Sequence, residues 1–149
     1  DFGQTKVIGR MIDEAYPNYE AVIPMDNDRM LTVSREAMLQ AVKRVALYSS
    51  SMPHQIRLSL KANEMTISAE DIERASEAKE RVLCEYDSDP MEIGFNSLYL
   101  GEVLSNLDGE DVQFAFSSPN RAGVVMPVDQ GEGEDMLMLI MPVMLNTYA

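Results

Sequence analysis

The chain has one cysteine, Cys84, and one histidine, His54, and these two side chains are of the types that nucleophilic chemistry uses. A cysteine hydrolase needs such a pair within hydrogen-bond reach. Cys84, however, alternates with Val82 and Tyr86, a pattern typical of a strand that faces a core. No phosphate-binding loop or zinc-ligand spacing accompanies the pair. The sequence therefore predicts no catalytic residue, no metal site and no cofactor, with a small hydrolase using Cys84 as a rival hypothesis.

A second group of reactive side chains is the acidic stretch over residues 129–135, Asp-Gln-Gly-Glu-Gly-Glu-Asp. Its oxygen atoms are of the kind that calcium prefers, but their spacing does not match an EF-hand loop. Glycine and acidic residues in this mixture are typical of a mobile surface loop. We therefore predict a solvated loop here.

The most apolar stretch follows directly, from Met136 to Leu145. Such a run normally predicts a buried strand. Pro142 interrupts it, and a proline belongs at the edge or end of a sheet because it cannot donate to the ladder. We expect the first part, to about Leu139, to complete a sheet. The remainder should carry methionines to the surface, where their adaptable thioethers suit partner binding.

Bulk composition limits the function classes. The chain has 149 residues, 46% hydrophobic composition and a net charge of −13. These values fit one domain with a core, or one domain and part of another. The acidic charge argues against broad electrostatic attraction to nucleic acid or membranes. A single cysteine suits a reducing compartment, and no apolar segment is long enough to span a membrane, so a cytoplasmic location is expected.

Two similar halves follow one another from residue 31 onward. Leu31 and Val33 form a short strand, and Ser34 can cap a helix that begins after it. Ile93, Phe95 and Asn96 repeat these positions 62 residues later. At the same offset, apolar helix positions pair as Met38 with Leu100, Ala41 with Val103, Val42 with Leu104 and Val45 with Leu107. Alternating strands follow each helix, which predicts a duplicated β-α-β-β-β unit.

The predicted fold class is α+β, with two helices side by side on one face of antiparallel sheet. Residues 28–149 would form this domain, and residues 1–27 the end of a preceding one with a linker. Residues 5–12 predict one strand. Pro17 and Pro24 bracket about one helical turn. A single strand and a turn cannot bury a core by themselves.

This order of elements resembles the bacterial β sliding clamp, the DNA polymerase III beta subunit. The resemblance rests on Tyr16-Pro17-Asn18-Tyr19 with Val22-Ile23-Pro24, on Ile93-Gly94-Phe95-Asn96 with Tyr99, and on Met141-Pro142-Val143. It implies the DNA-clamp fold, in which residues 1–27 end the middle domain and residues 28–149 form the third. The family is a non-catalytic processivity factor of DNA replication, a head-to-tail homodimer that closes around duplex DNA. The chain would be a C-terminal fragment of it.

The resemblance also implies a pocket for short peptides with a glutamine, leucines and a phenylalanine, carried by the polymerase, the clamp loader and repair proteins. The matching positions are Pro17, Ala21, Val22, Asn96, Tyr99, Arg121, Gly123, Leu139, Ile140, Met141, Pro142, Val143, Met144 and Leu145. Many clamps carry arginine where this chain has Ala21 and Met144, so the pocket should be less basic. The tail over residues 146–149 would extend past the usual end and partly cover the site.

Each pocket residue also has a purely structural interpretation. Asn96 matches Ser34, so helix capping alone would explain it. Tyr99 would be an ordinary helix packing residue with its hydroxyl at the edge. An unrelated acidic protein-interaction module without a DNA role therefore stays as the alternative function.

The first helix would face DNA in the family, with Lys43, Arg44 and, near its start, Arg35 as the DNA-facing residues. Cations near a helix C-terminus also favour the helix dipole, which is the structural alternative. Leu47 and Tyr48 would meet the first domain of the neighbouring subunit at the ring interface. The acidic residues from Glu70 to Glu80 would flank that contact, or form a solvated face.

Overall fold

The computed structural model describes residues 3–145, and from residue 29 onward its elements follow one order twice. A short 3-10 helix, η1 (Tyr19–Val22), precedes both units. The first unit contains β1 (Arg29–Ser34), α1 (Arg35–Ala46), β2 (Gln55–Lys61), β3 (Glu64–Asp71) and β4 (Ser76–Tyr86). The second contains β5 (Met91–Asn96), α2 (Ser97–Ser105), β6 (Asp111–Phe116), β7 (Gly123–Pro127) and β8 (Met138–Ile140). The predicted duplication is confirmed.

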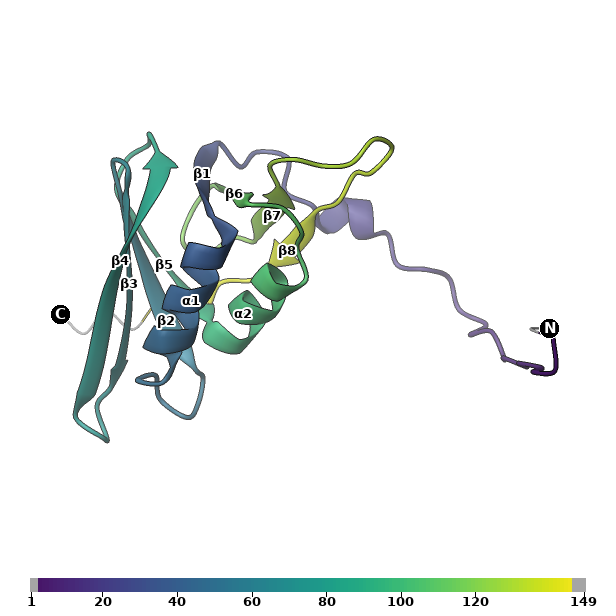
Figure 1. Ribbon diagram of the computed structural model, residues 1–149, viewed down its shortest axis with the longest axis horizontal. Helices are drawn as coiled ribbons and strands as arrows, with labels where there is room; N and C mark the ends of the chain where they lie inside the picture. The colour runs from purple at the N-terminus through teal and green to yellow at the C-terminus, as the bar shows by residue number, and fades with distance from the viewer. Residues whose placement is uncertain (1–2, 146–149) are drawn as a thin grey trace.

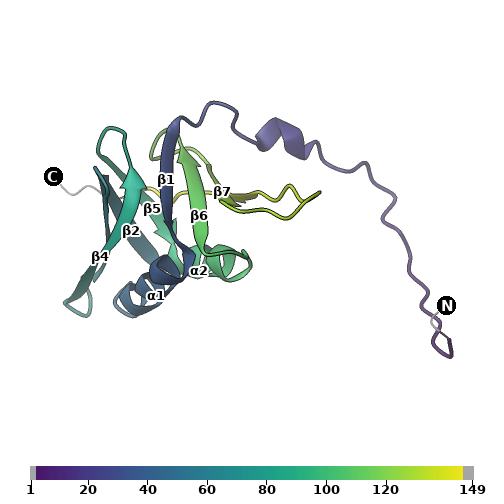
Figure 2. The same cartoon turned by 45° about the horizontal axis from the view of Figure 1, so that its top comes forward.

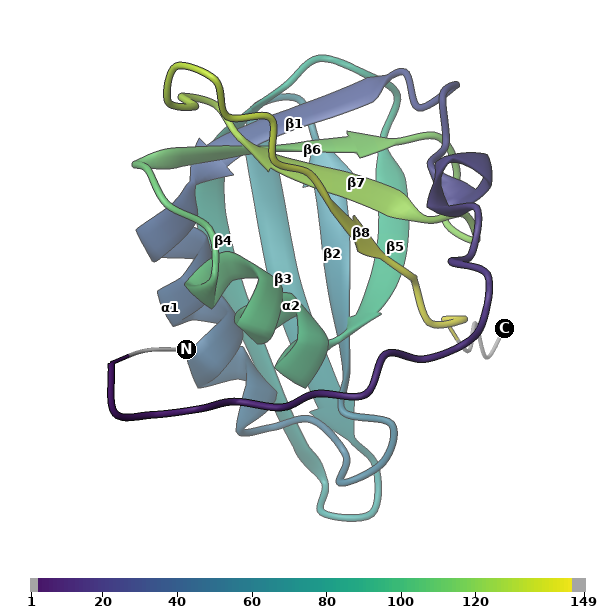
Figure 3. The same ribbon diagram turned by 90° about the vertical axis from the view of Figure 1, so that its right-hand side faces the viewer.

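The eight strands form one antiparallel sheet in the order β5-β2-β3-β4-β1-β6-β7-β8. Strands β1 and β5 exchange partners between the units, because β1 pairs with β6 and β5 pairs with β2. The sheet curls, and α1 and α2 lie next to each other against its inner side (Figures 1 and 3). The predicted α+β class and paired helices are confirmed.

Each helix starts at a side-chain cap at the end of a strand. The Ser34 hydroxyl accepts a hydrogen bond from the Ala37 amide, and the Asn96 carbonyl oxygen accepts from the Leu98 and Tyr99 amides. These bonds satisfy amides that the first turn of a helix leaves without partners. The repeated strand-cap-helix junction fixes where each helix enters the core.

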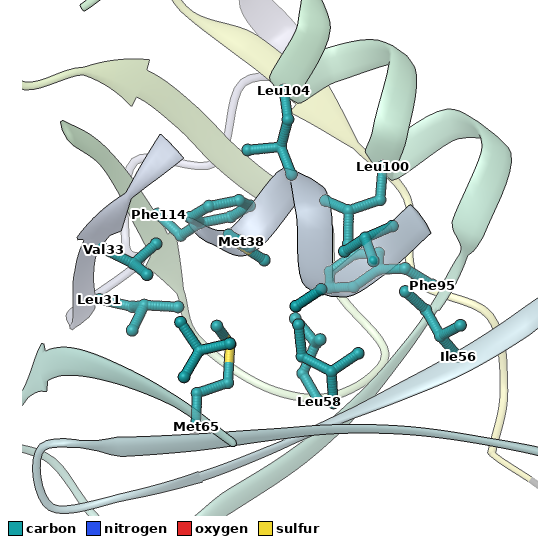
Figure 4. Close-up of a cluster of buried hydrophobic side chains, with 14 of the residues drawn as sticks. Leu31, Val33, Met38, Ile56, Leu58, Met65, Phe95, Leu100, Leu104 and Phe114 are labelled. Carbon is teal, nitrogen blue, oxygen red and sulfur yellow. The ribbon is translucent and has the colours of Figure 1, made fainter. Parts of the chain in front are cut away.

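The core lies between the helices and the curled sheet. Apolar side chains from the two units converge there, and Figure 4 shows Met38, Leu100 and Leu104 of the helices beside Phe95 and Phe114 of the strands. All five are fully buried. Neither unit can bury its apolar face without the other, so the duplicated halves fold as one body.

Three predictions of local structure differ from the observed fold. Residues 5–12 form no strand beyond a single bridge residue at Thr5, because the described chain offers them no partner, and they project away from the body (Figures 1 and 2). Helix α2 ends at Ser105, before Leu107, although Leu107 is still buried. The last strand spans Met138–Ile140, two residues later than its predicted start.

The late start of β8 has a visible cause in the loop before it. The Gln130 side chain accepts a hydrogen bond from the Met136 amide at 2.6 Å and donates one to the Met136 carbonyl at 3.3 Å. These two bonds engage Met136 outside the sheet. The acidic residues between them are exposed in a loop, as predicted.

A single asparagine attaches the linker to the sheet. The Asn27 side-chain amide donates to the Ala115 carbonyl at 2.9 Å and to the Ala122 carbonyl at 3.1 Å, which are at the ends of β6 and of the turn before β7. This contact attaches the linker that follows η1 to the part of the sheet where β6 ends and β7 begins, and η1 stands outside the body there (Figures 1 and 2). Among the described residues, no helix is long and apolar enough to cross a membrane.

Candidate functional site

Asn96 is a helix cap whose polar atoms are all engaged. Its carbonyl oxygen receives the Leu98 amide at 2.9 Å, and its side-chain amide donates to the Pro53 carbonyl at 3.0 Å. The capping interpretation is therefore confirmed. The bond to Pro53 adds a residue that no sequence motif pointed to, because Pro53 lies 43 positions earlier in a loop.

Tyr99 follows on the outer side of α2 and is not a packing residue. It has 64% of its surface exposed. The aromatic ring thus stands in solvent one helical turn after the cap. Large apolar surface in this position is available for a ligand.

The segment after β8, which we call the strap (residues 141–145), runs alongside β5. The Val143 amide donates to the Gly94 carbonyl at 2.9 Å, which makes an isolated antiparallel bridge. Met141 and Met144 project outward with 68% and 76% of their surfaces exposed, while Leu145 contacts Gly94. The strap therefore presents two methionines to solvent from a backbone attached to the sheet, as the position of Pro142 predicted.

The strap continues directly from β8, which pairs with β7. Gly123 pairs with Ile140, and a side chain at Gly123 would meet the Phe116 ring at 3.0 Å. Ile140 is buried and Leu139 half-buried. A larger residue at position 123 would therefore need the Phe116 ring to shift, which gives this glycine a packing role whatever its role toward a ligand.

Arg121 holds the linker rather than the strap. Its guanidinium donates to the Asp26 carboxylate at 2.6 Å. This hydrogen bond is the main cause that lowers the pKa of Asp26 below its usual value, with the positive charge adding to it. The same contact attaches the linker that follows η1. Ala21 and Val22 lie in η1 and Pro17 two residues before it, and all three are exposed.

Taken together, the predicted pocket residues form two groups. Asn96, Gly123, Ile140 and Val143 lie within the β5, β7 and β8 region, and Tyr99 stands beside it on α2, which contacts β8. Ala21 and Val22 lie in η1 and Pro17 just before it, in the segment that precedes the linker residues Asp26 and Asn27. Gly94 was visible in the sequence motif, but its direct contact with the strap was not. Residues 146–149 lie outside the described residues.

A hollow of about 690 Å³ lies next to Asn96, between the α1–β2 loop and the β3–β4 turn. Its lining includes Pro53, Met52 and Ile72 together with charged residues such as Arg57 and Glu77. Pro53 therefore links this hollow to the helix cap, since its carbonyl accepts a hydrogen bond from the Asn96 side-chain amide.

The predicted DNA-facing residues differ in their surroundings. Arg35 donates to the carbonyls of Gly109 at 3.0 Å and Leu104 at 3.2 Å, so it joins the start of α1 to the end of α2. Arg44 forms an ion pair with Glu80, which lowers the pKa of that carboxyl through its hydrogen bond. Lys43 is exposed on the same helix.

Two apolar residues stand at the end of α1. Leu47 has 79% of its surface exposed and Tyr48 has 44%. Adjacent exposed apolar side chains at one corner are the type of feature that an interface covers.

Cys84 and His54, the rival catalytic pair, lie at opposite ends of the sheet. His54 comes just before β2, whereas Cys84 follows Leu83, which is level with Glu64 and so with Lys61 at the end of β2. Seven strand positions separate these levels, or roughly 20 Å. Burial raises the pKa of the Cys84 thiol and so disfavours its thiolate. The geometry does not support a hydrolase.

Known proteins match this geometry over most of the chain. The family model described as the DNA polymerase III beta subunit, C-terminal domain, matches residues 20–144. A curated beta sliding clamp from Caulobacter vibrioides is 36% identical over 132 residues, which are 88% of this chain and 35% of that protein. The chain thus spans about a third of the length of this relative.

Solved structures agree with the sequence relatives. The DNA polymerase sliding clamp from Pseudomonas aeruginosa superposes with a TM-score of 0.85 at 34% identity, covering 90% of this chain and 36% of that one. A Caulobacter crescentus beta sliding clamp, described as having polyethylene glycol bound to a putative beta-motif tethering region, gives a TM-score of 0.83 at 35% identity over 90% of this chain and 35% of that one.

Proposed function

Because this chain belongs to the family defined by the C-terminal domain of the DNA polymerase III beta subunit, we propose that it is part of a sliding clamp, a processivity factor that encircles duplex DNA. In the whole protein, a head-to-tail homodimer would close the ring and act without catalysis in the cytoplasm. Enclosure replaces tight binding, so the net charge of −13 is compatible with a role on DNA. The comparisons give no support to an unrelated acidic interaction module.

The proposed domain division is residues 1–27 as the end of the middle domain and residues 28–149 as the third domain. Two observations support it. The paired units begin with β1 at Arg29, and all buried apolar residues of the core lie from Leu31 onward. Residues 3–18 have no core of their own, as expected for part of another domain.

We further propose that the β5–strap region, with Tyr99, docks short apolar peptides of the polymerase, the clamp loader and repair proteins. The observation that carries this proposal is the exposure of Tyr99, Met141 and Met144 around a strap that, among residues 3–145, one backbone hydrogen bond from Val143 to Gly94 joins to β5. Burying one leucine and one aromatic side chain of a peptide there would contribute about 1.5–3 kcal/mol each. After ordering costs, such contacts suit roughly micromolar affinity.

The ring and DNA contacts complete the proposal. Lys43 and Arg44 would approach phosphates from the inner side of the ring, while Arg35 would contribute chiefly by joining α1 to α2. Leu47 and Tyr48 would be covered by the neighbouring protomer. Both assignments concern the full-length dimer.

The test of peptide docking is a fluorescence anisotropy titration with a labelled peptide that contains a glutamine, leucines and a phenylalanine. Replacing Tyr99 and Met141 with alanine should weaken binding at least about 100-fold, because two apolar contact surfaces are lost. Leu83→Ala is the matched control, since Leu83 has 85% of its surface exposed and occupies the position of Met141 in the first unit. Undiminished binding in the double variant would move the site elsewhere.

A further inference from the structure

Because the chain is duplicated, the strap can be compared with its counterpart in the first unit, the end of β4. Strands β3 and β4 align with β7 and β8 at an offset of 58 residues, as the pairs Met65↔Val82 and Gly123↔Ile140 show. At this offset Glu85 corresponds to Val143, and Thr32 corresponds to Gly94 at the offset of 62. The pair Thr32↔Glu85 thus has Gly94↔Val143 as its counterpart. The strap occupies the position of the end of β4.

The end of β4 is held from two sides. On one side it pairs with β1 over three residues, from Leu31↔Tyr86 to Val33↔Cys84. On the other side the Asn63 carbonyl accepts the Cys84 amide at 3.5 Å, and the Asn63 amide donates to the Tyr86 carbonyl at 3.1 Å. The Tyr86 amide also donates to the Asn63 side chain at 3.3 Å.

The strap lacks the second of these attachments. Pro142 corresponds to Cys84 and has no N–H to donate, and Arg121 corresponds to Asn63 but uses its amide for the Ser118 carbonyl at 3.3 Å. The Arg121 side chain reaches Asp26 instead. Tyr86 is 1% exposed, whereas its counterpart Met144 is 76% exposed. The side chain at this position therefore lies in the core in the first unit and in solvent in the second.

Gly94 is therefore the residue on which the strap is seated. A Cβ atom at Gly94 would lie 2.7 Å from the Leu145 Cδ2 atom and 2.8 Å from the Val143 carbonyl oxygen. Both distances are shorter than van der Waals contact, and the second involves backbone that cannot rotate away. Gly94 does not have a positive φ, so the requirement for glycine is one of space. Thr32, its counterpart, carries a side chain where β1 pairs with the end of β4. We call that pairing the closed junction and the Gly94–Val143 bridge the open junction.

We propose that Gly94 is the positioning residue of the peptide site: by lacking a side chain, it sets how close the strap lies to β5 and hence where Met141 and Met144 stand. This inference rests on the proposed docking function. Any residue larger than glycine would lift the strap from the sheet and misplace both methionines. Gly94 itself need not touch the peptide.

The test compares Gly94→Ala with Gly101→Ala, whose added Cβ would have no neighbour within 4 Å. Gly94→Ala should weaken the labelled peptide about tenfold, and Gly101→Ala should leave its affinity unchanged. Amide hydrogen exchange at Val143 provides a second readout that needs no peptide. It should become about tenfold faster in Gly94→Ala and stay unchanged in the control.

Wild-type affinity in Gly94→Ala would overturn the positioning role. If the wild-type chain bound no peptide, the docking function would be overturned. The exchange comparison would still test the position of the strap, because unchanged exchange at Val143 in Gly94→Ala would contradict the role of Gly94. Should Gly94→Ala fail to fold, Leu145→Ala removes the same contact from the strap side. Faster amide exchange at Val143 in Leu145→Ala supports the proposal that the Gly94 contact positions the strap, and unchanged exchange overturns it.

Discussion

The β2–β3 turn and the β6–β7 turn occupy equivalent positions in the two units, but they form hydrogen bonds to different segments of the chain. Asn63, in the first turn, hydrogen-bonds the end of β4 through its amide, its carbonyl and its side chain. Arg121, in the second, bonds its own turn through its amide and the linker through its side chain. In the first unit, the turn attaches the end of the last strand, β4. In the second unit, the equivalent turn attaches the linker at Asp26 instead of the strap.

This difference shows how a duplicated unit acquires a site without changing its fold. The strand order and the two capped helices are the same in both halves. At the junction between the last strand and the sheet, the change comprises a different turn residue, Pro142, which removes one donor, and Gly94 in place of Thr32. The exposed methionines of the strap follow from that local change, because a backbone held at one bridge no longer directs them into the core.

Opening the closed junction should give the largest effect on stability. Asn63 has a positive φ of 55° and bonds the amide of buried Tyr86. Asn63→Ala should lower the free energy of unfolding by about 2 kcal/mol, combining the unsatisfied amide with left-handed backbone strain. Urea denaturation measures it. Asn63→Gly, which tolerates the φ, should cost about half as much, and equal losses in the two variants would contradict the role of strain.

Closing the open junction should have a smaller effect. Pro142→Ala restores an N–H at the position of Cys84, where it could bond the Arg121 carbonyl as Cys84 bonds Asn63. One added hydrogen bond of about 1 kcal/mol should slow amide exchange at Val143 roughly fivefold. Peptide affinity should fall as the strap tightens. Cys84→Ala, which keeps its N–H, is the matched control, and faster exchange in Pro142→Ala would show that proline stabilises the strap.

The smallest effect should come from the linker contact. The Arg121 hydrogen bond lowers the pKa of Asp26 in the folded chain, so this contact stabilises the fold above the usual aspartate pKa and is lost as pH falls through the lowered value. Both side chains are exposed, and salt should weaken the pair. An NMR titration of the Asp26 carboxyl should show its pKa rise toward the ordinary value in Arg121→Gln. An unchanged pKa in that variant would assign the shift to another cause.

The repeat was predictable from sequence because it appears as matched periodic positions. The caps and the apolar helix stripes recur at one offset of 62 residues, alternating strands follow each helix, and pairing them required no knowledge of contacts. Helix length was less accessible, since Leu107 is buried from a position beyond the end of α2. Residues 5–12 were misjudged because strand propensity says nothing about whether a partner strand is present.

The site was only partly accessible from sequence for a different reason. Pro142 and the methionines are visible as residue types, but the seat at Gly94 depends on contact between segments about 50 residues apart. Pro53 reaches Asn96 through a backbone carbonyl, which no residue type encodes. The engagement of Arg121 with Asp26 likewise spans 95 positions. Such contacts are set by the folded sheet and not by local pattern.

The side chain of Gln130 has a consequence for how this chain tolerates change. By bonding both backbone groups of Met136, it closes the base of the acidic loop as a strand partner would. The register of β8 is given by its pairing with β7, from Val125↔Met138 to Gly123↔Ile140, so the length of the loop beyond this base is not coupled to the sheet. Insertions between residues 131 and 135 should leave the fold intact, which makes this tip a suitable place for a fluorophore or an affinity tag.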